Sequence, residues 1–145
     1  MKICICGSIA FFDELLALKS KLEARGHVVA MPPTQVPDEH GKLIDVREYY
    51  KIRKSNTNDQ WVWDKKEIAM QIHFEKIEWS DAILVANYKK SDIEGYVGCN
   101  TLIEMGVAMF LKKPIYFLFK IPEMNCKEEI LGMKPIILNE DLRIL

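Results

Sequence analysis

The segment with the clearest chemical potential is GYVGCNTLIE, which runs from Gly95 to Glu104. It follows an apolar run and opens a predicted helix, so Glu104 is expected in the first helical turn. Unpaired backbone N–H groups and the helix dipole favour negative charge there, and an ionised carboxylate can act as a nucleophile. The spacing Thr101-x-x-Glu104 also matches a capping box, in which the glutamate only closes onto its own backbone. Spacing alone favours the cap.

Other residues could hold a ligand. Gly7-Ser8 follows the first apolar run and could offer N–H and hydroxyl groups to a phosphate or a sugar, although a serine-capped turn is equally economical. The further glycines of a dinucleotide fingerprint are missing. Gly98 would let a ligand approach the backbone. Asn87 and Asn100 could bind a sugar or a base, although a turn for Asn87 and a helix cap for Asn100 are their simpler roles.

The sequence indicates no metal and no organic cofactor. None of the three histidines has a partner at catalytic or metal spacing, namely His27, His40 and His73. The four cysteines also lack zinc-site spacing and are predicted to be reduced; they are Cys4, Cys6, Cys99 and Cys126.

Alternating strands and helices position these residues. Strands are predicted at 2–6, 28–31, 82–86, 115–119 and 135–138, and helices at about 11–25, 64–79, 100–111 and 127–131. In the helix 64–79, Ile68, Ile72 and Trp79 form one apolar stripe with Met70, Phe74 and Ile77 beside it, so the pattern predicts a wide apolar face. The pattern predicts an α/β fold with a doubly wound, Rossmann-like parallel sheet in the order 2-1-3-4-5. Ligands then bind at the carboxyl ends of the strands, between strands one and three.

A polar insertion at about 34–63 interrupts this alternation. It carries the cluster Asn56-Thr57-Asn58-Asp59 and only a weak helical pattern around 46–52, so we expect a lid within a single domain of residues 1–145. Its segment Tyr49-Tyr50-Lys51-Ile52-Arg53-Lys54 could contact a base or a phosphate, but a solvated charged face is the commoner role of such a run.

Composition excludes several classes of partner. The 145 residues include 20 basic and 21 acidic side chains, a formal net charge of −1, so no broad basic field is available for nucleic acid or an anionic membrane. No run approaches the roughly 20 apolar residues of a membrane span, and the N-terminus has no secretory apolar region. We therefore expect a cytoplasmic protein with a small-molecule ligand.

Three motifs together resemble the nucleoside 2-deoxyribosyltransferase superfamily: CGS at 6–8, WSDAILVAN at 79–87, and GYVG followed by TLIEMG at 95–106. The resemblance covers roughly residues 1–31 and 64–119. It implies that Glu104 attacks C1′ of a ribosyl or deoxyribosyl group and forms a covalent intermediate, as in a retaining glycosidase. Transfer to water makes such an enzyme a hydrolase, and transfer to a second base makes it a transferase. Some relatives prefer nucleoside 5′-monophosphates, and relatives commonly form homo-oligomers with sites near subunit interfaces.

The resemblance leaves two positions open. Asp81 matches an aspartate that relatives use in the site, yet it opens a predicted strand, away from the ligand end, where a structural hydrogen bond is an equal explanation. Gly98 stands where the transferases carry an aspartate. The nearest acids are Asp92 and Glu94, with Asp92 the candidate for a sugar contact, and this departure weakens the assignment as a transferase.

Two other functions remain compatible with these motifs. A non-catalytic nucleotide-sensing domain would use Gly7-Ser8 and the Gly98 loop to hold its ligand, while Glu104 only capped a helix. A phosphate-binding relative with a different reaction is the third, because fold does not fix function.

Overall fold

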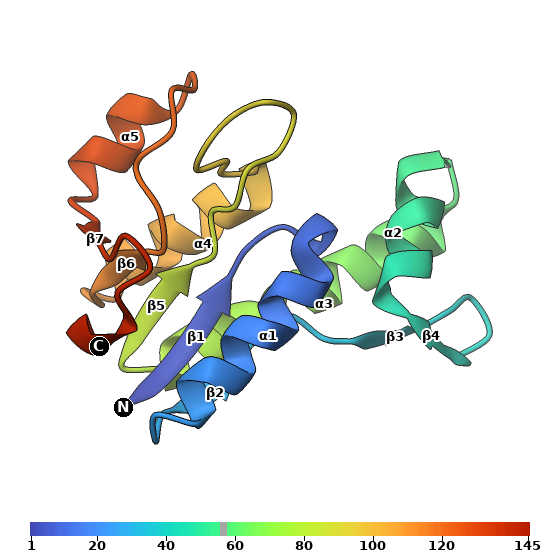
Figure 1. Cartoon of the computed structure of the whole chain (residues 1–145). Helices are drawn as coiled ribbons and strands as arrows, with labels where there is room; N and C mark the ends of the chain where they lie inside the picture. Colours follow the sequence, from blue (N-terminus) through green and yellow to red (C-terminus); the bar gives the residue numbers. More distant parts are fainter. Residues whose placement is uncertain (56–57) are drawn as a thin grey trace.

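A computed structural model describes residues 1–55 and 58–145, so Asn56 and Thr57 of the predicted polar cluster lie outside the described residues. The five strands of the main sheet are β1 (Lys2–Cys6), β2 (Val28–Ala30), β5 (Ala82–Val85), β6 (Ile115–Phe117) and β7 (Ile136–Ile137). They are parallel and lie in the order β2-β1-β5-β6-β7 (Figure 1). This confirms the predicted α/β class and strand order.

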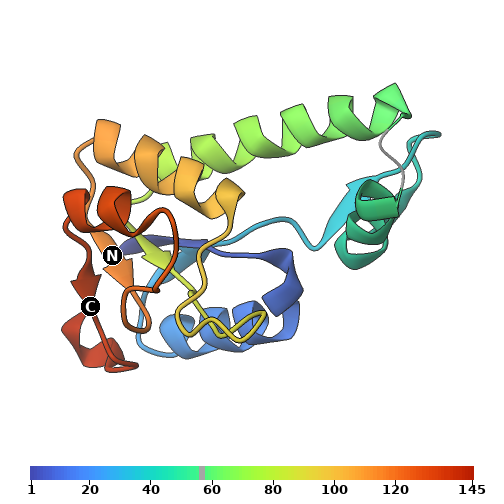
Figure 2. The same ribbon diagram turned by 90° about the horizontal axis from the view of Figure 1, so that it is seen from above.

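Helices cover both faces of the sheet because both faces of its central strands are apolar. Ile3 and Ile5 of β1 pack with α1 (Phe12–Glu23) in one cluster. Cys4 and Cys6 face the opposite side, as residues two apart in a strand must. That side is covered by α3 (Gln60–Trp79), α4 (Cys99–Phe110) and α5 (Lys127–Gly132) (Figure 2). Two short 3-10 helices complete the chain, η1 (Ile9–Phe11) and η2 (Leu142–Ile144).

The insertion has more structure than the sequence indicated. It forms an antiparallel hairpin of β3 (Gln35–Pro37) and β4 (Leu43–Asp45), followed by α2 (Val46–Ser55). These elements stand together at one end of the molecule (Figure 1). The hairpin was not predicted, because each strand has three residues and one contains a proline. The following helix also begins earlier than expected, at Gln60.

The insertion is held by a small apolar cluster of its own. Val36 and Val46 pack there with Phe12 of α1 and with Val62 of α3. Tyr49 of α2 is 3% exposed, and its hydroxyl donates a hydrogen bond of 2.6 Å to the Val62 carbonyl. The insertion is therefore fixed against both neighbouring helices.

The inward face of α3 is only part of the predicted one. Ile68, Ile72 and Trp79 are 49%, 44% and 42% exposed, whereas His73 and Ile77 are buried. The predicted face was right for Ile77 and wrong for the stripe of Ile68, Ile72 and Trp79, because apolar residues lie on both sides of α3 and hydrophobicity alone does not separate them. His73 can be buried there because it finds polar partners inside. Within the described residues, no helix is long and apolar enough to cross a membrane.

Candidate active site

A cavity of about 640 Å³ opens where the carboxyl end of β1 meets the insertion. Gly7 and Ser8 after β1 line one part of it, and Gly98, Asn100 and Glu104 at the start of α4 line another. Residues of α2 and α3 also line it. A volume of this size is typical of small-molecule sites. Its position beside β1 and β5 agrees with the ligand site expected for a doubly wound sheet.

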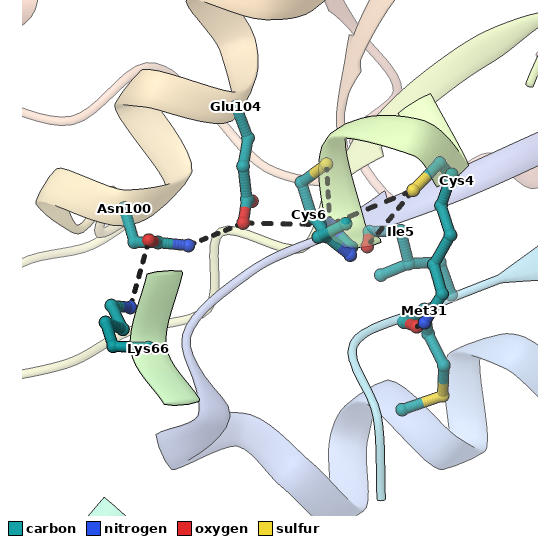
Figure 3. A network of polar contacts seen from close by, with 9 residues as sticks. Cys4, Ile5, Cys6, Met31, Lys66, Asn100 and Glu104 are labelled. Carbon is teal, nitrogen blue, oxygen red and sulfur yellow. Dashed lines mark hydrogen bonds and ion pairs between the residues drawn. The ribbon is translucent and has the colours of Figure 1, made fainter. Parts of the chain in front are cut away.

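Glu104 is buried in this cavity wall, with 2% of its surface exposed. α4 begins at Cys99 after Gly98, which makes no side-chain cap, so Glu104 lies in the second turn and the predicted capping box is absent. Its Oε1 accepts a hydrogen bond of 2.6 Å from Asn100 Nδ2, one turn earlier (Figure 3). Its Oε2 has no hydrogen-bond partner among the described residues. The carboxylate is therefore not folded back onto its own backbone.

Burial sets the protonation of this carboxyl group. It raises the pKa of Glu104 to about 7, and the nearby charge of His73 opposes that rise. The expected stabilisation of the anion by a first helical turn does not apply in the second turn. A carboxyl group with a pKa near neutrality is common at catalytic sites, because either protonation state is accessible there.

His73 is the site residue that the sequence did not indicate. It is 4% exposed, and its Nε2 lies 3.7 Å from Glu104 Oε1, 3.6 Å from Cys6 Sγ and 3.8 Å from Cys4 Sγ. Burial lowers the pKa of His73, but the contact with Cys4 and the charge of Glu104 outweigh it, so the net direction is upward. The prediction that this histidine has no partner was wrong, because its partners lie on another helix and on a strand 67 and 69 residues away.

The same cluster contains residue types that can bind a metal ion. The ligand-capable atoms of Cys4, Cys6 and His73 all lie within 4.8 Å of one another, and thiolates with an imidazole suit soft metals such as zinc. The cysteines are free, as predicted, and their contacts with His73 Nε2 have hydrogen-bonding geometry. The two thiols therefore contact His73 Nε2 and hold the imidazole in place.

Five of the eight predicted site residues come together at the cavity; they are Gly7, Ser8, Gly98, Asn100 and Glu104. Ser8 also caps η1, since its Oγ accepts a hydrogen bond of 3.2 Å from the N–H of Ala10. A Cβ at Gly7 would lie 3.3 Å from both Ala86 and Leu15, so this turn has little room for a side chain. Asn100 orients Glu104 and is not the N-cap that was its simplest explanation.

The other three predicted residues do not line the cavity. Asn87 is fully buried and ties two loops together: its Nδ2 donates to the Lys120 carbonyl at 2.9 Å, and its Oδ1 accepts from the N–H of Phe119 at 2.9 Å. Asp81 precedes β5 at the opposite end of the sheet, where its Oδ2 accepts from the N–H of Lys2 at 2.7 Å. Asp92 is an exposed turn residue with a φ of 60°.

The insertion contributes residues of α2 to the cavity lining. Tyr49, Tyr50, Arg53 and Lys54 of α2 line the cavity, although a solvated face was expected for them. Their helical spacing was the available signal, since residues one turn apart share a face. On α3, Lys66 Nζ donates a hydrogen bond of 3.1 Å to Asn100 Oδ1 (Figure 3).

Comparisons with known proteins bear on the fold. No protein-family model matches the sequence, and no curated protein matches it significantly. Among solved structures, the chain is similar to a 2-deoxyribosyltransferase from the psychrotolerant bacterium Bacillus psychrosaccharolyticus, with a TM-score of 0.51 and 16% sequence identity. The match covers 81% of this chain and 72% of that one. A match at 16% identity shows that the two chains share an α/β fold.

Proposed function

We propose that the protein cleaves the N-glycosidic bond of a nucleoside or a nucleoside 5′-monophosphate through a covalent bond to Glu104. The observation that carries the proposal is a buried carboxylate at a cavity, with one oxygen held by Asn100 and the other without a hydrogen-bond partner among the described residues. The motif resemblance and the shared fold of a 2-deoxyribosyltransferase support it.

The reaction has two displacements. A carboxylate oxygen of Glu104 attacks C1′ of the sugar, and the C1′–N bond breaks as the new C1′–O bond forms. The base leaves with the electron pair of the broken bond and takes up a proton, which water in the cavity can supply. Attack of water or of a second base on C1′ then releases Glu104. Gly98 takes the place of an acid found in the related transferases, so water is the acceptor that we favour.

Neighbouring side chains prepare the carboxylate. Asn100 donates to Oε1 and so fixes the orientation of the Glu104 carboxylate. The positive charge of His73, 3.7 Å from Oε1, lowers the pKa of Glu104 against the effect of burial. His73 is a positioning residue in this scheme, because it acts on the nucleophile and not on the sugar.

Aromatic side chains can hold the base. Tyr50, Trp63 and Tyr96 line the same cavity as Glu104. Nucleobases stack on such rings, with contributions of about 1–3 kcal/mol per base. The cavity thus combines an apolar surface for the base with a carboxylate for the sugar.

The test is to incubate the protein with a panel of nucleosides and 5′-monophosphates, with and without an acceptor base, and to analyse the products by chromatography. Release of base without an acceptor indicates a hydrolase, and exchange only with an acceptor indicates a transferase. Glu104→Gln should lower turnover by on the order of 10³-fold or more, because an amide cannot attack C1′. Circular dichroism should show a retained fold.

Two controls make this test specific. Glu75→Gln changes an exposed glutamate of α3, and Asp81→Asn changes a residue at the far end of the sheet; both should keep turnover within about twofold. Full activity of Glu104→Gln would overturn the proposal. Ligand-dependent melting without any turnover would instead support the nucleotide-sensing function.

A further inference from the structure

The cavity carries a local excess of positive charge. Among the described residues that line it, Arg53, Lys54, Lys66 and Lys90 are cationic, and Glu104 is the single carboxylate. The whole chain has 20 basic and 21 acidic residues, so its composition does not account for this excess. Like charges gathered around a cavity cost free energy unless a ligand compensates them. The charge pattern therefore points to an anionic ligand.

Three of these cations form one wall, from α2 and α3. The Arg53 guanidinium lies over the Tyr50 ring, 5.1 Å from its centroid, and Lys54 Nζ lies 5.4 Å from the same centroid. Burial lowers the pKa of Lys66 to about 8, and the charges of Arg53 and Lys54 act in the same direction. The charges of Arg53 and Lys54 therefore act unfavourably on the Lys66 ammonium, and an anion bound beside these groups would relieve this repulsion.

The wall is connected to the nucleophile. Lys66 Nζ uses one of its three donors on Asn100 Oδ1 at 3.1 Å, and Asn100 Nδ2 donates to Glu104 Oε1 at 2.6 Å. Two hydrogen bonds thus separate the Lys66 ammonium from the carboxylate. In a sugar 5′-phosphate, the phosphate is attached through C5′ to C4′, and the anomeric carbon C1′ lies on the other side of the ring oxygen. A ligand with its phosphate at Lys66 can therefore present C1′ to Glu104.

We infer that Arg53, Lys54 and Lys66 bind a terminal phosphate monoester, so that the substrate is a nucleoside 5′-monophosphate and not the free nucleoside. A monoester carries close to two negative charges at neutral pH, and both guanidinium and ammonium groups bind it by charge-assisted hydrogen bonds. The inference rests on the proposed function for the identity of the remainder of the ligand. The phosphate site itself is testable without turnover.

The first experiment measures binding alone. Glu104→Gln protein is titrated by calorimetry with 2-deoxyribose 5-phosphate, with inorganic phosphate and with 2-deoxyribose. We expect the two phosphates to bind and the neutral sugar to bind at least about tenfold more weakly than its phosphate. Adding Arg53→Gln or Lys54→Gln should weaken phosphate binding by about tenfold each. Lys51→Gln is the matched control, since Lys51 is exposed on the same helix and does not line the cavity.

The second experiment measures kcat/KM for a 5′-monophosphate and its nucleoside in the unmodified protein and in Arg53→Gln. In Arg53→Gln, kcat/KM should fall by about tenfold or more for the monophosphate and stay unchanged for the nucleoside, because the nucleoside has no phosphate for Arg53 to bind. Equal losses for both substrates, or equal binding of sugar and sugar phosphate in the first experiment, would overturn the inference. Phosphate binding without turnover of any substrate would support the phosphate site and refute the proposed reaction. Failure of the phosphate site and failure of the proposed function are therefore distinguishable.

Discussion

Glu104 should make activity depend on pH near neutrality. Burial raises the pKa of this carboxyl to about 7, and the groups that face it are His73 and Lys66 from α3 and Cys4 and Cys6 from β1. Because the nucleophile must be ionised, kcat/KM should rise as pH passes about 7. Removing the cation in His73→Gln should raise the Glu104 pKa and move this rise to higher pH.

The measurement is the pH profile of kcat/KM for both proteins, with His27→Gln as a histidine control far from the site. A variant that only loosened the fold would lower the whole profile without moving its midpoint. An unchanged midpoint in His73→Gln would show that His73 does not tune the carboxylate.

The same carboxyl group should lower the stability of the fold above neutral pH. Its pKa in the folded protein, about 7, lies above the ordinary value of 4.5, so it favours folding most below pH 4.5 and this contribution is lost as pH rises through 7. Glu104→Gln, which carries no charge, should therefore be the more stable protein at pH 8, by up to about 3 kcal/mol.

Urea denaturation at pH 5 and pH 8 measures this difference. The gain from Glu104→Gln should be small at pH 5 and larger at pH 8. A variant that is less stable than the unmodified protein at pH 8 would show that the charged carboxylate is a net stabilising group.

The sequence identified part of the site at the scale of single residues. Glu104, Gly7 and Gly98 were found because a loop and the helix after it are continuous in sequence, and the motif preserves their spacing. His73 was missed because its partners Cys4 and Glu104 become neighbours only when the helix packs on the sheet.

At the scale of elements, Tyr49 joins α2 to α3 through a hydrogen bond. Its hydroxyl is buried and donates to the Val62 carbonyl at 2.6 Å. Tyr49→Phe should lower the free energy of unfolding by about 1 kcal/mol, since one buried hydrogen bond is lost and the ring is kept. It should also speed amide hydrogen exchange in α2.

Tyr50→Phe is the control on the same helix. Tyr50 is half-buried, and its ring faces Arg53 and Lys54 in the cavity wall. Removing its hydroxyl should change the free energy of unfolding by less than about 0.5 kcal/mol. If both variants lose the same stability, the Tyr49 hydrogen bond contributes nothing of its own.

The regular elements were predictable and the insertion was not. Continuous apolar runs such as Ala82–Val85 occur in parallel strands covered on both sides, and right-handed crossovers then determine the strand order. The hairpin of β3 and β4 has strands too short for periodicity. The buried side of α3 was also hard to predict, because apolar side chains lie on both its inner and its outer surface.

At the scale of the whole molecule, the outer surfaces of α3 and α4 carry exposed apolar side chains. Ile68 and Ile72 of α3 are 49% and 44% exposed, and Met109 and Phe110 of α4 are 53% and 84% exposed. The two helices cover the same side of the sheet (Figure 2). Apolar surface gathered in this way is typical of an interface, and it agrees with the homo-oligomer expected from the resemblance.

Sedimentation velocity tests this expectation. The protein should sediment as a species larger than the 16.8 kDa chain, and Phe110→Glu should shift it toward the monomer because a charge at an apolar interface must be desolvated. Leu43→Glu is the control, since Leu43 is 60% exposed on the distant hairpin. A monomer at tens of micromolar would contradict the expectation.

The two walls of the cavity belong to different packing clusters. Val62 and Val46 anchor the wall that the insertion provides, while Met105 and Val85 anchor the helix that carries the glutamate in the core beneath the sheet. Mutations in residues 34–55 can therefore accumulate without repacking the support of Glu104. Descendants of such a chain could acquire new ligand preferences by rebuilding one peripheral segment, while the buried carboxylate and its helix are inherited unchanged.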